Sequence, residues 1–513
     1  MNPGKVYLIG AGPGDPELIT AKGLRCLEAA DVVVYDHLVD ESLLENARKD
    51  ARLVFAGKQQ SHHTLRQEET NALLVSLGQE GKVVARLKGG DPFVLGRGGE
   101  EAAALAASGV PFEVVPGVTA AVAVPAYAGI PLTHRRLASS FAVITGHETL
   151  DKGQSTVDWA RVAGGADTLV FLMGFANLAP ICRGLVEHGR SPATPAAVIR
   201  WGTYPWQETV TGTLADIAQR AAEANMTPPA VLVVGEVVGL RDSLRWFDRR
   251  LLFGKRILVT RSRHQASRLS KLLSQEGAEP VELPTIEIQK AHSSSLDEAL
   301  TRLGDFGWVV FTSANGVEAL FSLLIESGRD ARALGGVKIC ALGDATAEAL
   351  WGWGLRADLV PSKFSAGGIL SAFDDALGST KGGRDVAGVR FLLPRAEDVP
   401  PELADGLRQR GAVVEELTVY RTQPAGPSEQ SRKLVESADI ITFTSSSTVN
   451  GLARMVGGDV GLINRATVAC IGPVTAATAI GMGIRTPVVA QTHTIPGLVS
   501  ALLEYEMAGW EGK

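Results

Sequence analysis

The sequence has little of what marks several whole classes of protein. It contains four cysteines in 513 residues, Cys26, Cys182, Cys340 and Cys470, and their wide separation fits neither a disulfide framework nor a zinc cluster. Each is expected to be a small buried apolar residue in a reducing compartment. The net charge is -6, so no general positive field is present to hold nucleic acid or an anionic membrane. An anionic ligand would need a locally basic pocket.

Long apolar runs are also scarce. The segment Val114–Thr133 is free of charge, but it contains three prolines and two glycines, which a lone membrane-spanning helix tolerates badly. We expect it to be a buried loop and helix. The N-terminal residues enter a strand pattern at Val6–Ile9 without the apolar segment of a signal peptide, and this predicts a cytoplasmic protein with no membrane partner.

What the chain does contain is an alternation of short β-branched runs with helical patterns, which predicts an α/β fold. The charged, aromatic segment Arg245–Arg250 is followed by a fresh strand pattern at Arg256–Arg261. We therefore predict one domain over residues 1–247 and another over 254–513. In the first half, strands are expected at Val6–Ile9, Val32–Tyr35, Val83–Leu87, Phe112–Val115, Phe141–Thr145, Thr168–Met173 and Val231–Val234.

The second half contains an internal repeat. Four segments recur in the same order and at nearly the same offset, which predicts two similar α/β lobes with a ligand cleft between them. Chance similarity among strand-then-helix units is the alternative interpretation. The pairs are Ile257–Arg261 with Phe391–Arg395, Gly277–Ala278 with Gly411–Ala412, Phe311–Val317 with Phe443–Val449, and Gly343–Thr346 with Gly472–Thr475.

A glycine-rich loop, Gly10–Leu18, follows the first expected strand. A dinucleotide-binding fingerprint would need its third glycine at position 15, which is Asp15. Asp15 and Pro16 are instead typical of a helix N-cap followed by proline, and the carboxylate would compete with a pyrophosphate. The loop suits an uncharged or zwitterionic ligand. A nicotinamide dinucleotide is the alternative, favoured by Asp36 at the end of the next strand.

Two further loops follow strands. Gly89 and Gly90 expose backbone groups, and Asp91 supplies an acceptor, although a tight turn and helix cap would explain the same residues. The segment Pro116–Ala121 adds small residues and the hydroxyl of Thr119.

These three loops, with segments 33–39 and 129–135, closely resemble uroporphyrinogen-III C-methyltransferases, which belong to the tetrapyrrole methyltransferases. The resemblance covers residues 5–247. It implies two α/β lobes that hold S-adenosylmethionine between them and release S-adenosylhomocysteine. It also implies two successive methyl transfers to ring carbons of uroporphyrinogen III, giving precorrin-2, and a homodimer formed through this half.

The resemblance further implies roles for single residues. Asp36 matches the family's proton acceptor and Lys58 its proton donor. A base has a chemical purpose in this reaction, because a methylated ring carbon must afterwards lose a proton. A cap at Asp36 and substrate-carboxylate pairing at Lys58 are the alternatives. Arg135, between His134 and Arg136, either clamps substrate carboxylates or lies in a solvated basic turn. The implied cofactor residues are Pro13, Gly89, Gly90, Asp91, Val94, Thr119, Ala120, Met173 and Gly202.

The second half contains no metal cluster, P-loop or nucleophile elbow. Hydroxyl-rich turns follow its strands at Thr312–Asn315, Thr444–Ser447 and Gly472–Thr475, where they are either helix caps or carboxylate-binding groups. A set of segments resembles uroporphyrinogen-III synthases over residues 256–505, namely Ile257–Arg261, Val310–Val317, Val419–Arg421, Gly472–Thr475 and Thr494–Leu498.

That second resemblance implies closure of linear hydroxymethylbilane to uroporphyrinogen III with inversion of the last ring, without any cofactor or metal. It implies lobes formed by 254–283 with 421–513 and by 284–420. Tyr420 is the candidate acid for the departing hydroxyl, or else a linker tyrosine that packs between lobes. The cleft candidates are Arg261, Thr312, Ser313 and Thr475.

The two resemblances are mutually consistent, since the product of one half would be the substrate of the other. They predict a bifunctional enzyme of tetrapyrrole biosynthesis, leading to sirohaem or cobalamin, with small-molecule tetrapyrrole substrates and no nucleic-acid partner. The alternative is a nicotinamide-dependent oxidoreductase joined to a two-lobed binding module without catalysis.

Overall fold

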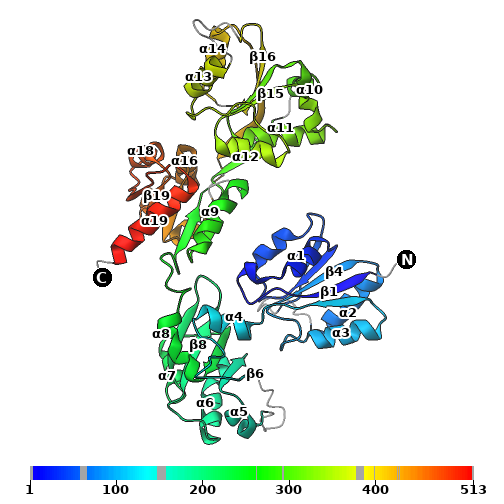
Figure 1. Ribbon diagram of the computed structural model, residues 1–513, viewed down its shortest axis with the longest axis vertical. Helices are drawn as coiled ribbons and strands as arrows, with labels where there is room; N and C mark the ends of the chain where they lie inside the picture. The colour runs from blue at the N-terminus through cyan, green and yellow to red at the C-terminus, as the bar shows by residue number, and fades with distance from the viewer. Residues whose placement is uncertain are drawn as a thin grey trace. The chain divides into compact units, whose positions relative to one another are not determined.

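The computed structural model describes residues 4–57, 66–146, 157–260, 263–291, 294–376, 386–397, 399–424, 426 and 428–510. Over these ranges the chain forms four five-stranded sheets with helices packed on them (Figure 1), which confirms the α/β prediction. The chain divides into two compact units. One contains Met1–Ile257, Ser270–Val281 and Val499–Lys513, and the other contains Leu258–Leu269 and Glu282–Leu498. The domain limits drawn from the sequence stay a prediction.

The first sheet is wholly parallel, and it forms what we call the first lobe, blue to cyan in Figure 1. Its strands are short and mainly apolar, as expected where helices cover both faces of a sheet. Parallel strands place their carboxyl ends at one edge, so the loops that follow β1, β2, β4 and β5 converge there. The order is β3 (Arg52–Phe55), β2 (Val32–Tyr35), β4 (Val83–Lys88), β1 (Lys5–Gly10), β5 (Phe112–Val115). The helices are η1 (Pro16–Leu18), α1 (Ala21–Glu28), η2 (Glu41–Asn46), α2 (Gln67–Gln79) and α3 (Gly98–Ala107).

The second sheet forms the second lobe and is mixed. β6 and β7 are parallel, whereas β10 is antiparallel to β7 and β8, and β8 is antiparallel to β9. The order is β6 (Phe141–Thr145), β7 (Thr168–Leu172), β10 (Ala230–Val234), β8 (Pro195–Arg200), β9 (Glu208–Thr213). The helices are α5 (Trp159–Gly165), η3 (Phe175–Asn177), α6 (Leu178–Glu187), α7 (Ile217–Glu223), η4 (Glu236–Leu240) and α8 (Arg241–Leu244).

The charge-free segment Val114–Thr133 contains the end of β5, a loop and helix α4 (Ala120–Tyr127), as expected. α4 packs against the second sheet, and its Ala121 and Val124 belong to that sheet's core. Of the helices in the described ranges, none combines the length and the apolar character needed to cross a membrane. Cys182, Cys340 and Cys470 are buried, as predicted, while Cys26 is partly exposed.

The remaining two sheets contain the repeated segments. One has the order β12 (Glu279–Glu282), β11 (Arg256–Val259), β18 (Ile440–Phe443), β19 (Thr467–Cys470), β20 (Val488–Val489). The other has the order β13 (Ile286–Lys290), β17 (Val413–Pro424), β16 (Arg390–Ala396), β14 (Trp308–Phe311), β15 (Lys338–Ala341). The helices are α9 (Arg263–Gln275), α10 (Ser294–Thr301), η5 (Leu303–Asp305), α11 (Ala314–Glu326), η6 (Ala331–Leu334), α12 (Asp344–Gly352), α13 (Ala366–Ala376), α14 (Glu402–Gln409), α15 (Glu429–Glu436), α16 (Ser446–Met455), α17 (Val460–Ile463), α18 (Pro473–Gly481) and α19 (Ile495–Trp510).

Corresponding segments occupy corresponding places in these two sheets. β11 lies between β12 and β18, just as β16 lies between β17 and β14, and β19 follows β18 as β15 follows β14. The two sequence repeats are nevertheless divided between the sheets. One sheet combines β11 and β12 of the first repeat with β18 and β19 of the second. The other combines β14 and β15 of the first repeat with β16 and β17 of the second.

Candidate functional site

The three glycine-containing loops of the first lobe touch through their backbones. Gly90 N donates to Gly12 O at 2.7 Å, and Gly12 N donates to Gly90 O at 3.3 Å. A Cβ on Gly10 would lie 2.5 Å from Cα of Gly117, and a Cβ on Gly117 would lie 2.4 Å from the carbonyl oxygen of Gly90. Because atoms at such distances would overlap sterically, these positions admit glycine alone unless the backbone moves.

Asp15 anchors the first loop. Its carboxylate accepts from Glu17 N at 2.8 Å, the cap predicted from the sequence, and from the Tyr127 hydroxyl at 2.7 Å. Burial, and then the hydrogen bond with this carboxylate, raise the pKa of Tyr127. Asp15 N in turn donates to Thr203 Oγ1 in the second lobe at 2.9 Å. The first loop is thereby tied to both lobes.

Asp91 holds two loops together. One carboxylate oxygen accepts from Phe93 N at 2.8 Å and the other from Gly117 N at 2.9 Å. These contacts are those of a turn that is braced against the third loop. A role of Asp91 in balancing a cationic ligand stays a prediction.

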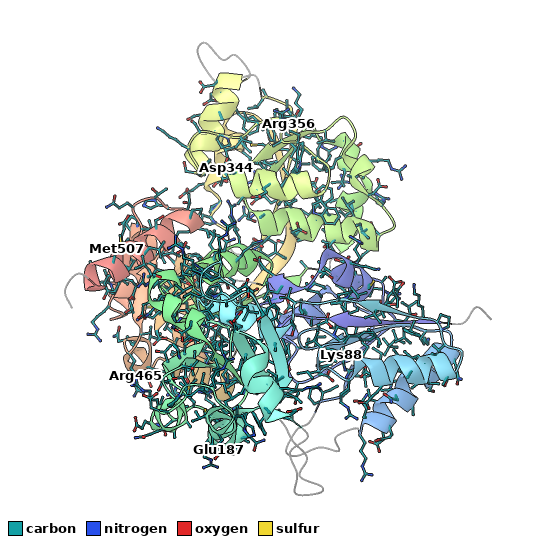
Figure 2. The ribbon with its side chains drawn as sticks, turned by 60° about the horizontal axis from the view of Figure 1, so that its bottom comes forward. Lys88, Glu187, Asp344, Arg356, Arg465 and Met507 are labelled. Atoms are coloured by element: carbon teal, nitrogen blue, oxygen red, sulfur yellow. The ribbon has the colours of Figure 1, made fainter. Side chains whose placement is uncertain are left out.

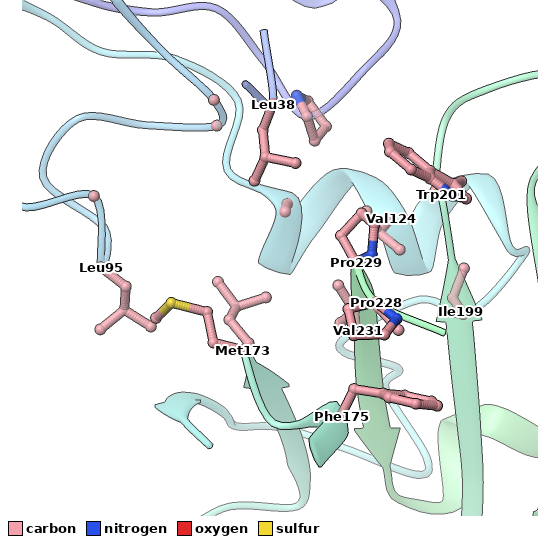
Figure 3. Close-up of a pocket in the computed structure, with 18 of the residues that line it drawn as sticks. Leu38, Leu95, Val124, Met173, Phe175, Ile199, Trp201, Pro228, Pro229 and Val231 are labelled. Carbon is pink, nitrogen blue, oxygen red and sulfur yellow. The ribbon is translucent and has the colours of Figure 1, made fainter. Parts of the chain in front are cut away.

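A cavity of about 430 Å³ opens beside these loops (Figure 3). Leu38 and Leu95 line it from the first lobe, whereas Trp201 and Val231 line it from the second. The predicted cofactor residues Pro13, Gly89, Gly90, Val94, Ala120, Met173 and Gly202 are among its lining residues. Asp91 and Thr119 are not, although each adjoins a lining residue in the chain. The structure thus gathers most of this set around one small-molecule-sized space.

Several lining residues carry backbone strain that the sequence did not signal. Leu95, Met173 and Trp201 have φ values of 55°, 57° and 48°. This left-handed conformation is rare for residues with side chains, costs about 1–3 kcal/mol each, and is concentrated at functional sites. Sequence reasoning expects glycine or asparagine there, so it missed Leu95 and Trp201. It also missed the lining residues Leu38, Val124, Phe175, Tyr204, Pro228 and Pro229.

A buried cluster of charged side chains stands behind the loop after β4. Asp36 Oδ1 accepts from Arg86 Nη2 at 2.6 Å, and Lys88 Nζ lies 3.8 Å from Asp36 Oδ2. Glu101, which is fully buried on α3, accepts from Lys88 Nζ at 2.9 Å and from Arg86 Nε at 3.1 Å. Burial, and then the charge of Arg86, lower the pKa of Lys88. Asp36 is therefore an ion-paired carboxylate. Its partners Arg86 and Lys88, and Glu101 on their other side, were not singled out from the sequence.

The remaining methyltransferase-half candidates lie elsewhere. Lys58 lies outside the described residues. Arg135 and Arg136 are exposed, in a turn closed by hydrogen bonds between the backbones of His134 and Ala138. Arg135 is not a lining residue of the cavity. Its role as a substrate clamp stays a prediction.

In the second half the structure brings two candidates together. The Tyr420 hydroxyl, on β17, lies 3.2 Å from Ser313 Oγ. Ser313 also caps α11 by accepting from Gly316 N at 3.1 Å, and Thr312 precedes it. Tyr420 is buried in the core of its own lobe, and its hydroxyl reaches the hydroxyl-rich turn. Its roles as an acid and as a tyrosine that packs between the lobes both stay predictions.

Thr475 lies on α18, beside β19 of the other sheet, and is 5% exposed. Arg261 lies outside the described residues. The shared cleft predicted for these residues with Ser313 and Tyr420 stays a prediction.

Comparisons with known proteins assign each half. The family described as Tetrapyrrole (Corrin/Porphyrin) Methylases matches residues 5–218, and the family described as Uroporphyrinogen-III synthase HemD matches residues 267–500. The porphyrin biosynthesis protein HemD of Ruminiclostridium josui is 38% identical over 510 residues, 98% of this chain and 98% of that protein. The uroporphyrinogen-III C-methyltransferase of Methanocaldococcus jannaschii is 53% identical over 47% of this chain and 99% of that protein.

One similar solved structure is the uroporphyrin-III C-methyl transferase from Thermus thermophilus complexed with S-adenyl homocysteine. It has 42% sequence identity to this chain, covers 46% of this chain and 100% of that one, and has a TM-score of 0.40.

Proposed function

The chain belongs to the tetrapyrrole methylases in its N-terminal half and to the uroporphyrinogen-III synthases in its C-terminal half, and from this we propose two consecutive reactions. The C-terminal half closes hydroxymethylbilane to uroporphyrinogen III with inversion of the last ring. The N-terminal half methylates that product twice, at ring carbons, to give precorrin-2. The observation that carries the proposal is the cavity at the meeting point of the three glycine loops, in a chain related along almost its whole length to a porphyrin biosynthesis protein.

The cavity suits S-adenosylmethionine. Its wall consists mainly of glycines, prolines and aliphatic or aromatic side chains, and its volume lies in the usual range for small-molecule sites, about 300–1,000 Å³. Gly202 lies so close to Val124 that a Cβ would lie 2.4 Å from Val124 Cγ1. Only glycine therefore fits at this point of the wall without a shift of Val124. S-adenosylmethionine supplies an electrophilic methyl group on a positively charged sulfur. We propose no cofactor for the synthase half.

In the methyl transfers, Asp36 takes the proton that the methylated ring carbon must lose. Arg86 holds the carboxylate through a 2.6 Å contact. The chain continues from Asp36 to Leu38, which lines the cavity, so the base stands at the edge of the proposed cofactor site. Lys58 as proton donor and Arg135 as carboxylate clamp complete the proposed substrate contacts.

In the ring closure, the chain contributes mainly binding and folding of the linear substrate. Hydroxyl-capped helix starts such as that of α11 suit its carboxylates. Tyr420, hydrogen-bonded to Ser313, protonates the departing hydroxyl. Thr312, Thr475 and Arg261 line the same proposed cleft. Holding the two reacting ends together supplies much of the acceleration.

The proposal is tested with the purified chain, hydroxymethylbilane and labelled S-adenosylmethionine, followed by product mass and isomer analysis. Dimethylated type III product is expected. Type III product without label would overturn the methyltransferase assignment. If the only product is the type I isomer that forms by spontaneous closure, the synthase assignment falls.

A further inference from the structure

The four-residue cluster of Asp36, Arg86, Lys88 and Glu101 contains two cations and two anions, almost wholly shielded from water. The side chains of Arg86 and Lys88 are 3% and 4% exposed, and that of Glu101 is 0% exposed. Only the side chain of Asp36, at 28%, reaches the surface. A buried charge is costly unless it is paired. The four charges therefore depend on one another, and only Asp36 can meet a ligand.

Strand geometry explains how two cations face one carboxylate. Arg86 and Lys88 are two residues apart on β4 and therefore point to the same side of the sheet. β2 runs parallel beside β4 with Tyr35 opposite Leu87, which places Asp36 next to both cations. Lys88 itself can be located in the first lobe in Figure 2.

Glu101 is bound in an unusual way. Its Oε1 accepts from Arg86 Nε, from Lys88 Nζ and, at 3.4 Å, from Gln67 Nε2 of α2, whereas its Oε2 is buried with no hydrogen-bond partner among the described residues. A buried, half-satisfied carboxylate lowers stability. Packing alone would favour an apolar residue at this position on α3.

We propose that Lys88 and Glu101 are positioning residues for the methyl transfers. Together they determine how strongly the ionised side chain of Asp36 is stabilised beside the cavity. Lys88 adds a second positive charge to that of Arg86. Glu101 draws both cations toward α3 and so limits their pull on Asp36. The proposal rests on the proposed function, in which Asp36 is the base.

The balance predicts opposite effects of two neutralising substitutions. Without the charge of Lys88, Asp36 keeps only Arg86, and the ionised form needed for proton removal is lost at a higher pH. Without the charge of Glu101, both cations act on Asp36, and its ionised form survives to a lower pH. Among the described residues, Glu100 on α3 also interacts electrostatically with Lys88, and Glu100 is the same in both variants.

The experiment measures initial rates of methyl transfer to added uroporphyrinogen III by the full chain, from the lowest pH at which each variant stays folded up to pH 9. For Lys88→Met, the pH of half-maximal kcat/KM on the acid side should rise by about one unit, a roughly tenfold loss of rate below it. For Glu101→Gln it should move by a similar amount in the opposite direction. The double variant should return toward the wild-type midpoint, and Lys88→Arg should retain it.

Matched controls are Lys82→Met and Glu80→Gln, because both residues are exposed and lie just before the same strand. Neither control should move the midpoint. Thermal melting checks that each variant folds. If Lys88→Met melts too early for assay, Glu101→Gln and the double variant carry the same comparison.

Coincident midpoints for the wild type, Lys88→Met and Glu101→Gln, or shifts in one common direction, would overturn the inference. A merely structural role would lower rates or melting temperatures without opposite shifts. The variant Asp36→Asn distinguishes a failure of this inference from a failure of the proposed function. If it is inactive while the midpoints coincide, only the inference falls; if it methylates at the wild-type rate, the proposed base falls and the inference with it.

Discussion

At the scale of single residues, glycines and strained side chains shape the methyltransferase site. Gly10, Gly90 and Gly117 let three backbone segments touch, while Leu95 and Met173 hold left-handed conformations beside the cavity. Both features serve the same end, since they place backbone groups and side chains where ordinary geometry would not put them.

Gly117→Ala should damage this arrangement. The new methyl group would lie 2.4 Å from the carbonyl oxygen of Gly90, forcing the second and third loops apart. We expect a loss of about 1–3 kcal/mol in the free energy of unfolding and at least tenfold weaker binding of S-adenosylhomocysteine, measured by denaturation and by calorimetry. Gly164→Ala on α5 is the control, because a Cβ there meets nothing within 4 Å. Unchanged ligand affinity in Gly117→Ala would contradict the role given to the loop contact.

At the scale of elements, ion pairs fasten the edge strand of the first sheet. Glu113 on β5 accepts from Lys22 of α1 and, at 2.6 Å, from Lys5 of β1. These contacts join two neighbouring strands and the helix that follows the first of them. β5 leads directly into the third glycine loop, so this edge also supports the site.

The pH dependence of stability should reflect this cluster. Hydrogen bonds from Lys22 and Lys5 lower the pKa of Glu113 to about 2 from its usual 4.5. Because the folded-state pKa is depressed, the stabilisation is present above about pH 4.5 and is lost as the pH falls toward 2. We expect Glu113→Gln to reduce the fall in melting temperature between pH 5 and 2.5, as followed by circular dichroism. Equal falls in variant and wild type would contradict this.

At the scale of the whole molecule, the two halves carry separate machinery on one chain. The proposed base Asp36 directly follows β2 of the first sheet, and Tyr420 belongs to β17. Because these residues stand in different sheets with separate cores, substitutions in one site should leave the chemistry of the other intact.

Asp36→Asn should abolish methylation but still convert hydroxymethylbilane to uroporphyrinogen III at the wild-type rate. Tyr420→Phe should slow ring closure by about 10²-fold, the lower end for loss of a general acid, while methylation of added uroporphyrinogen III continues. Each variant is assayed for both reactions in parallel. If Tyr420→Phe closes the ring at the wild-type rate, Tyr420 has a packing role only. Loss of both reactions in either variant would contradict separate machinery.

The homodimer that the methyltransferase resemblance implies gives a further expectation. Light scattering after gel filtration should show twice the chain mass of 54.0 kDa. A strictly monomeric species that methylates at the full rate would exclude the dimer as a requirement.

Much of this architecture was readable in the sequence for a definite reason. The seven strands expected in the first half are all present, and most of them are central, buried strands in which apolar residues predominate. β3 escaped prediction because it is short and opens with an exposed charged residue, β9 because threonines and a glycine interrupt its apolar pattern, and β8 because it begins with a proline and two alanines. The Asp15 cap was predictable because capping depends on neighbours in the chain.

What only the tertiary structure decided are relations between distant segments. The sequence revealed four repeated pairs but not that each sheet combines strands from both repeats, since a repeat records similarity and not partnership. It pointed to Asp36 but not to Arg86, Lys88 and Glu101 around it, and it missed Leu95 and Trp201 in the cavity wall. Local patterns follow from neighbouring residues, whereas burial of charge and strained backbone depend on what folding brings into contact from far along the chain.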